Sequence, residues 1–157
     1  MSQLNRIEAS FLEKNLDPIG ESIKNDVLED LGIAGIETLR YAEAFYLDFP
    51  LSQKELSQIA EKVFIDPLFQ GAFINQNSFK KFDYSLEVKF HPDVTDNVGI
   101  VSLEAVSDFL GKKMEGTVRT SRKYYFFGTI TKSDVERIAR EMLANGVIET
   151  YSIEAGK

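Results

Sequence analysis

Apolar and polar residues alternate at two places 79 positions apart, residues 7–11 and residues 86–90. A period of two is typical of a strand with one buried face. After each predicted strand, mostly apolar residues return at every fourth position, over residues 19–31 and residues 98–110. This spacing predicts an amphipathic helix in both places, and a glycine follows each one, as is common at helix C-termini.

Each segment also predicts a hairpin, a second helix and a closing strand. The hairpin strands are residues 36–40 and 45–49 in the first segment and residues 117–120 and 124–127 in the second. The second helix is indicated by capping-box spacing at Ser52 with Glu55 and, more weakly, at Thr131 with Asp134. The closing strands carry residues 69–73 and 151–153. The order β-α-β-β-α-β in each segment is the ferredoxin-like arrangement of α+β proteins.

We interpret the two segments as copies of one unit. An offset of 79 aligns residues 6–76 with residues 85–155 without a gap, and thirteen of these 71 pairs are identical, where chance gives about four. The identical pairs include Glu8/Glu87, Phe11/Phe90, Asp17/Asp96, Gly20/Gly99, Gly32/Gly111, Arg40/Arg119 and Tyr46/Tyr125.

The repeat defines the expected domain organisation. We assign residues 1–76 to a first unit, 77–84 to a linker and 85–157 to a second unit. A unit of roughly 75 residues has a marginal core. We therefore expect two tandem ferredoxin-like units that form one pseudo-twofold intramolecular dimer.

Composition is that of a globular protein, with 43% apolar and 27% charged residues in 157. Eighteen basic and twenty-five acidic side chains give a net charge of −7. Residues 1–78 hold six basic and thirteen acidic side chains (−7), whereas residues 79–157 hold twelve of each (0). An acidic chain is a poor candidate for nucleic-acid binding, which needs a basic face.

Missing residue types exclude several chemistries. The chain has no cysteine and one histidine, His91, which excludes disulfides, thiolate metal sites, a cysteine nucleophile and a multi-histidine metal site. His91, Asp93 and Asp96 lack the spacing of a calcium loop. We expect no catalytic, cofactor-binding or metal-binding residue. With no membrane-length apolar run and no signal-peptide pattern, a cytoplasmic protein without membrane contact is expected.

The two strand-to-helix turns are candidate contact sites. Asp17 stands at an N-cap position with Pro18 at the first helical position, and Gly20 follows. Asp96 and Gly99 are the matching residues of the second segment. A capped turn explains these residues structurally. The functional alternative is a backbone-lined contact with a ligand or partner at the helix N-termini.

A basic cluster at residues 119–123 is the other candidate contact. Arg119, Arg122 and Lys123 fall on the predicted second hairpin, with two hydroxyl residues between them. Such a group could hold a phosphate or a carboxylate-rich partner surface. The alternative is a solvated turn.

Two short stretches carry a resemblance to a known family. Leu16–Gly20 reads Leu-Asp-Pro-Ile-Gly, and Leu143–Tyr151 reads Leu-Ala-Asn-Gly-Val-Ile-Glu-Thr-Tyr. Both resemble signatures of the PurS family, the small subunit of phosphoribosylformylglycinamidine synthase. Each signature survives in one copy only, because Asn97 replaces the proline in the second copy and residues 64–69 differ in the first. The resemblance nevertheless covers nearly the whole chain.

The resemblance implies a non-catalytic scaffold in de novo purine biosynthesis. Family members act as dimers that bridge an ATP-dependent synthetase (PurL-type) and a glutaminase (PurQ-type), so that ammonia passes between active sites. Long single-chain synthases carry a duplicated unit as their N-terminal domain. The assembled enzyme is a glutamine-dependent ligase that uses ATP, magnesium and glutamine, none of which is expected on this chain. The seven candidate partner contacts are Asp17, Gly20, Asp96, Gly99, Arg119, Arg122 and Lys123.

One alternative comes from another class of protein. Tandem ferredoxin-like units also occur in small-molecule regulatory domains, which bind amino acids between the copies. Further homodimerisation, and whether the chain is free-standing or part of a longer synthase, stay open from the sequence.

Overall fold

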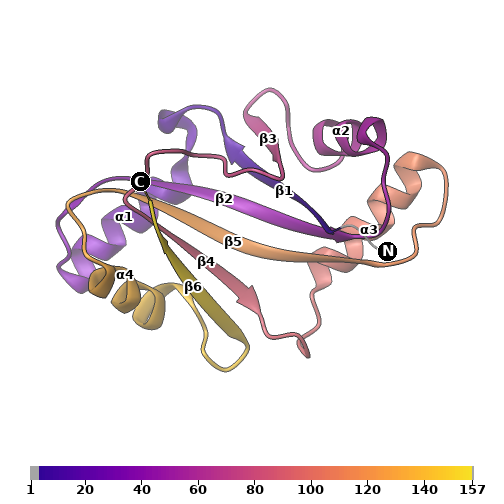
Figure 1. Cartoon of the computed structure of the whole chain (residues 1–157). Coiled ribbons are helices and arrows are strands. Elements are labelled where there is room, and N and C mark those ends of the chain that lie inside the picture. Colours follow the sequence, from indigo (N-terminus) through magenta and orange to yellow (C-terminus); the bar gives the residue numbers. More distant parts are fainter. Residues whose placement is uncertain (1–3, 157) are drawn as a thin grey trace.

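The computed structural model describes residues 4–156, which form a six-stranded antiparallel sheet and four α-helices (Figure 1). The elements are β1 (Leu4–Phe11), α1 (Pro18–Leu31), β2 (Ile36–Asp48), α2 (Gln53–Lys62), β3 (Gln70–Ile74), β4 (Tyr84–Phe90), α3 (Asn97–Leu110), β5 (Thr117–Gly128), α4 (Lys132–Ile138) and β6 (Glu149–Ala155). The strands lie in the order β3-β1-β2-β5-β4-β6. The predicted α+β class is confirmed.

The predicted hairpins are wrong, because β2 and β5 are each one long strand. These strands pair with each other along nearly their whole length, from Ile36 opposite Gly128 to Asp48 opposite Thr117. Neither Tyr41–Ala44 nor the matching part of β5 contains the glycine, proline, asparagine or aspartate that a tight turn favours. Each half of the chain therefore contributes three strands, and the long central pair joins the halves.

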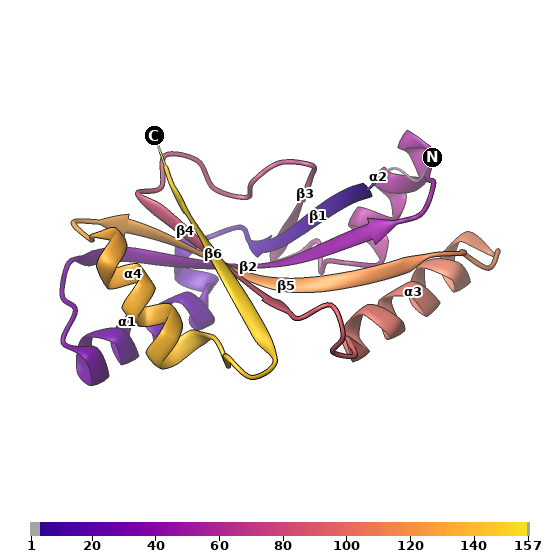
Figure 2. The same cartoon turned by 60° about the horizontal axis from the view of Figure 1, so that its bottom comes forward.

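All four helices cover one face of the sheet, in two pairs that each combine the two halves of the chain. Figure 2 shows α1 and α4 together below one end of the sheet and α3 below the other. Val27 of α1 packs in one hydrophobic cluster with Leu86 of β4 and Val135 of α4. Val106 of α3 packs in a second cluster with Leu56 of α2 and with residues of β1 and β2. Both cores are thus built from both predicted units.

Helix ends follow local rules that the sequence already displays. Gly32 and Gly111 end α1 and α3 in the left-handed conformation, with φ of 68° and 70°, which a glycine adopts without steric cost. The capping boxes are confirmed, with reciprocal bonds between Ser52 and Glu55 and between Thr131 and Asp134. No helix within residues 4–156 is long and apolar enough to cross a membrane.

The connection between β3 and β4 crosses the face of the sheet that carries no helix (Figure 1). β3 is an edge strand and β4 lies beyond β1, β2 and β5, so this connection has to pass over the sheet. Residues 75–83 make this crossing, and Phe79 and Phe82 pack there on Tyr125. We call this side the open face.

Candidate functional site

Asp17 anchors the start of α1 against the edge of β2. Its Oδ1 accepts a hydrogen bond from the Gly20 N–H at 2.9 Å, and its Oδ2 accepts from Arg40 Nε and the Tyr41 N–H, both at 3.0 Å. β1 pairs with β2 only from Ala42 onward, so the Tyr41 N–H has no strand partner on this side. A Cβ at Gly20 would overlap a β2 carbonyl oxygen, so only glycine allows this close approach.

Asp96 does the same for α3. It accepts from the Gly99 N–H at 2.9 Å and from the Thr120 N–H at 2.6 Å, and a Cβ at Gly99 would overlap the Val118 carbonyl. Arg119 donates to the carbonyls of the loop before α3. The structure brings Asp96, Gly99 and Arg119 together around a cavity of about 230 Å³. Both aspartates therefore serve as buried caps, and a partner contact at these turns stays a prediction.

The predicted basic cluster is divided between the two faces of β5. Arg122 lies on the helix-covered face, where it donates to Glu149 Oε2 and to the Leu143 carbonyl, both at 2.8 Å. Arg119 and Lys123 alternate onto the open face, and Lys123 is only 4% exposed. Their predicted location on a turn is wrong because β5 runs straight through it. Their role as partner contacts stays a prediction.

The Arg122–Glu149 pair predicts a pH-dependent stability. Burial alone would raise the Glu149 pKa, but bonds from the Arg122 guanidinium and the Asn145 N–H outweigh it and hold that pKa below its ordinary value. A depressed pKa adds stability above the ordinary pKa and loses it as pH falls through the lowered one. Glu149→Gln should cost about 1–2 kcal/mol at pH 7. In urea titrations from pH 7 to 3, the gap to wild type should close below about pH 4.5; a constant gap would contradict the assignment.

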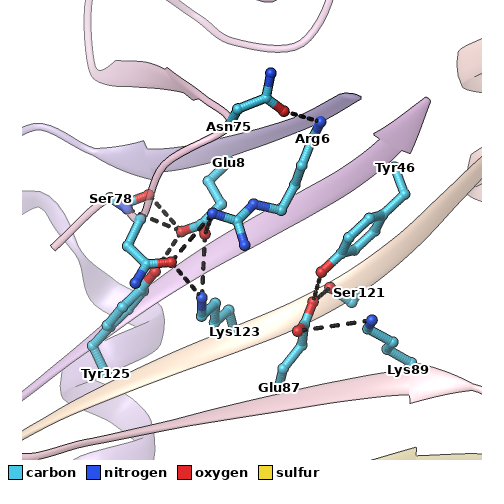
Figure 3. Close-up of polar contacts among 11 residues, drawn as sticks. Arg6, Glu8, Tyr46, Asn75, Ser78, Glu87, Lys89, Ser121, Lys123 and Tyr125 are labelled. Carbon is cyan, nitrogen blue, oxygen red and sulfur yellow. Dashed lines mark hydrogen bonds and ion pairs between the residues drawn. The ribbon is translucent and has the colours of Figure 1, made fainter. Parts of the chain in front are cut away.

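Two carboxylates on the open face, Glu8, which is buried, and Glu87, which is half-buried, were not selected by the sequence analysis. The Glu8 side chain is fully buried. Its Oε1 accepts from Ser78 N–H, Ser78 Oγ and Tyr125 Oη at 3.1, 2.9 and 2.6 Å, and its Oε2 lies 3.4 Å from both Lys123 Nζ and Arg6 Nη2. Figure 3 shows these donors converging on Glu8 from three directions.

The second carboxylate, Glu87, has fewer partners. Its Oε2 accepts from Tyr46 Oη and from Ser121 Oγ, and Lys89 Nζ lies 3.9 Å from Oε1. Burial, followed by the bond to Glu87, raises the pKa of Tyr46 above its ordinary value, so this phenol stays protonated and donates. The signal for these residues was present in the repeat, since Glu8/Glu87 and Tyr46/Tyr125 are two of the identical pairs.

The outer face of α3 exposes more large apolar side chains than that of α1, where Ile19 and Leu28 are exposed. Val98, Ile100, Val101 and Phe109 are between 45% and 63% exposed. At the matching positions, 79 residues earlier, α1 carries Ile19, Glu21, Ser22 and Asp30. A cavity of about 510 Å³ lies at the C-terminal end of α3, where Leu103, Asp108 and Met114 line it but none of the four exposed apolar residues of α3 does. Exposed apolar residues that cluster in this way mark an interaction surface more often than a solvated one.

Within residues 4–156, no three histidine, aspartate or glutamate side chains lie close enough to hold a metal ion. Glu8 is shielded from solvent by the crossing segment. Searches against known protein families and against curated proteins find no match to this chain.

Proposed function

We propose that this chain is a non-catalytic scaffold of phosphoribosylformylglycinamidine synthase, made of two fused PurS-like units. The observation that carries the proposal is that contacts recur at an offset of 79 residues. Asp17 and Asp96 cap their helices through the same atom, Oδ1, and Gly20 and Gly99 each lie in close contact with a strand carbonyl. These correspondences support a duplicated unit, as in the dimers that the family forms.

The pairing of the central strands supports an internal twofold axis. Glu43 lies opposite Arg122, which is its own counterpart at an offset of 79. Every pair on one side of this point therefore has a matching pair on the other. Across the axis, Tyr125 donates to Glu8 and Tyr46 donates to Glu87. Each tyrosine thus bonds the carboxylate of the other unit, as in a symmetric dimer.

The two ends of the helix layer differ in a way that suits two different partners. Large apolar side chains are exposed at four positions of α3 but at only two of α1, Ile19 and Leu28. The net charges of −7 and 0 belong to the two halves of the sequence, which each helix pair combines. A homodimer would present both surfaces twice. A fused pair presents each once, so that one partner, synthetase or glutaminase, occupies each side. Such a scaffold would act in the cytoplasm by holding two active sites close together.

The experiment measures assembly and turnover with purified synthetase and glutaminase. Adding this chain should allow co-elution of the three proteins and raise glutamine-driven turnover more than ammonia-driven turnover. Val101→Glu on α3 should raise the dissociation constant of the complex about tenfold and so reduce co-elution, because a carboxylate would enter an apolar contact. Ser22→Glu, at the matching position of α1, is the control and should leave assembly unchanged. Absence of co-elution, with no change in either rate, would contradict the proposal.

A further inference from the structure

The two carboxylates of the open face occupy equivalent positions but have different surroundings. On the Glu8 side, the crossing segment places Ser78 and Phe79 on the sheet. Ser78 gives two hydrogen bonds to Glu8 Oε1, and Phe79 packs edge-on against Tyr125 with ring centroids 5.1 Å apart. An extended segment of the chain therefore satisfies the carboxylate and covers the tyrosine.

No such segment covers the Glu87 side within residues 4–156. Both hydrogen bonds to Glu87 reach Oε2. Within the part of the chain that the structure describes, Oε1 accepts no hydrogen bond, and the Lys89 ammonium lies 3.9 Å from it, beyond hydrogen-bond distance. The Glu87 side chain is 13% exposed, whereas that of Glu8 is fully buried. Among residues 4–156, the atom that corresponds to the acceptor of Ser78 therefore has no donor within hydrogen-bond distance on the Glu87 side (Figure 3).

A small cavity lies near this carboxylate, next to Tyr46 and Lys89, which contact Glu87. It has a volume of about 270 Å³, and its walls combine apolar Leu4, Tyr46 and Phe90 with charged Asp48, Lys89 and Arg119. Leu4, on one wall of the cavity, is 59% exposed. Lys89 lies over the Tyr46 ring, 4.4 Å from its centroid, so the remaining edge of that ring faces the cavity.

We propose that the Glu87 side of the open face binds an extended polypeptide segment of a partner protein. The segment donates a backbone N–H or a hydroxyl to Glu87 Oε1 and places an aromatic or large apolar side chain in the cavity beside Tyr46. The occupant is a polypeptide because residues 78 and 79 of this chain do the same on the equivalent side. The inference rests on the proposed function in one respect: that function would identify the partner protein that supplies the segment.

The test uses a capped peptide with the sequence of residues 75–83 as the probe, added to the isotope-labelled full chain. A short tether gives the crossing segment an effective concentration of roughly 1 mM, so a dissociation constant of about that size is sufficient. We expect saturable shifts of the amide resonances of Leu4, Tyr46 and Glu87. Peptides carrying Ser78→Ala or Phe79→Ala should bind more weakly, and a scrambled peptide should not bind.

Glu87→Gln supplies the matched variant of the protein. Its amide oxygen can still accept from Tyr46 and Ser121, while its NH₂ group replaces Oε1 and opposes an incoming donor. Peptide binding should weaken about tenfold, or 1.4 kcal/mol, with the amide spectrum otherwise preserved. The inference would be overturned if peptide well above roughly 1 mM gave no saturable shift. It would also be overturned if the variant bound the peptide as tightly as the wild type. Self-association that Glu87→Gln abolishes would also overturn it, in favour of a second copy as the occupant. No synthase partner is used, so failure here is separate from failure of the scaffold proposal.

Discussion

Residues 79–157, produced without the rest of the chain, are expected not to fold as a monomer. In the whole protein, α4 and β4 pack against Val27 of α1 and Leu39 of β2. The inner face of α3, around Val106, packs on α2 and β1. The fragment would keep its own strands but would lose the partners of both helices. Each buried aliphatic side chain that is exposed costs roughly 1.5–3 kcal/mol, and the total stability of a small domain is about 5–15 kcal/mol.

Circular dichroism and sedimentation velocity check this expectation together. The monomeric fragment should show no cooperative thermal transition. Mixing it with residues 1–78 should restore a 1:1 complex with the spectrum of the whole chain, because the β2–β5 pairing and both cores then re-form. A fragment that folds only as a homodimer would agree with the shared-core interpretation, because the second copy would replace the missing half. A monomeric fragment with cooperative unfolding would contradict it.

Local signals in the sequence predicted most of the elements correctly. The strand at residues 7–11, the helix that begins after Asp17 and the capping box at Ser52 all occur where the pattern indicated. Each depends on residues within a few positions of one another, because side-chain alternation and caps are properties of neighbours in the chain. The glycines that end α1 and α3 belong to the same class.

Long-range organisation was less predictable. The middle parts of β2 and β5 were interpreted as turns, but Glu43 and Arg122 lie opposite each other there, at the centre of the sheet and between the two helix pairs. Charged side chains occur at this point because the helices leave it partly open to solvent, and not because the chain reverses direction. No local signal predicts that α1 packs with α4 of the second half and α3 with α2 of the first half. Both halves show the same helix pattern, whichever core the helix joins.

The role of the basic residues was unpredictable for a related reason. Arg122 and Lys123 are neighbours in sequence, yet they point to opposite faces of β5 and bond to Glu149 and Glu8, respectively. A cluster of charges on a strand is divided between faces by the pleat. The two carboxylates of the open face could have been found from the repeat, because a glutamate and a tyrosine that are identical in both copies of an apolar strand pattern require a structural reason.

Glu8→Gln should destabilise the protein far more than Glu87→Gln. Lys123, whose side chain is 5% exposed, lies 3.4 Å from Glu8, and breaking a buried ion pair from one side costs about 3–5 kcal/mol. Lys89 is 46% exposed and lies 3.9 Å from Glu87, and a pair of that kind contributes under about 1 kcal/mol. Urea unfolding at pH 7 compares the two variants, which make the same chemical change at equivalent positions.

A double variant separates the unpaired charge from the lost hydrogen bonds. In Glu8→Gln the amide oxygen can still accept from Tyr125 or Ser78, so most of the loss should come from the buried Lys123 ammonium. Adding Lys123→Met removes that charge, and the pair should recover more than half of the lost stability, because a neutral replacement of a buried ion pair is often tolerated. Equal losses for Glu8→Gln and Glu87→Gln, or no recovery in the double variant, would show that the crossing segment and not the ion pair stabilises this face. The inference about the Glu87 side would then depend on the cavity alone.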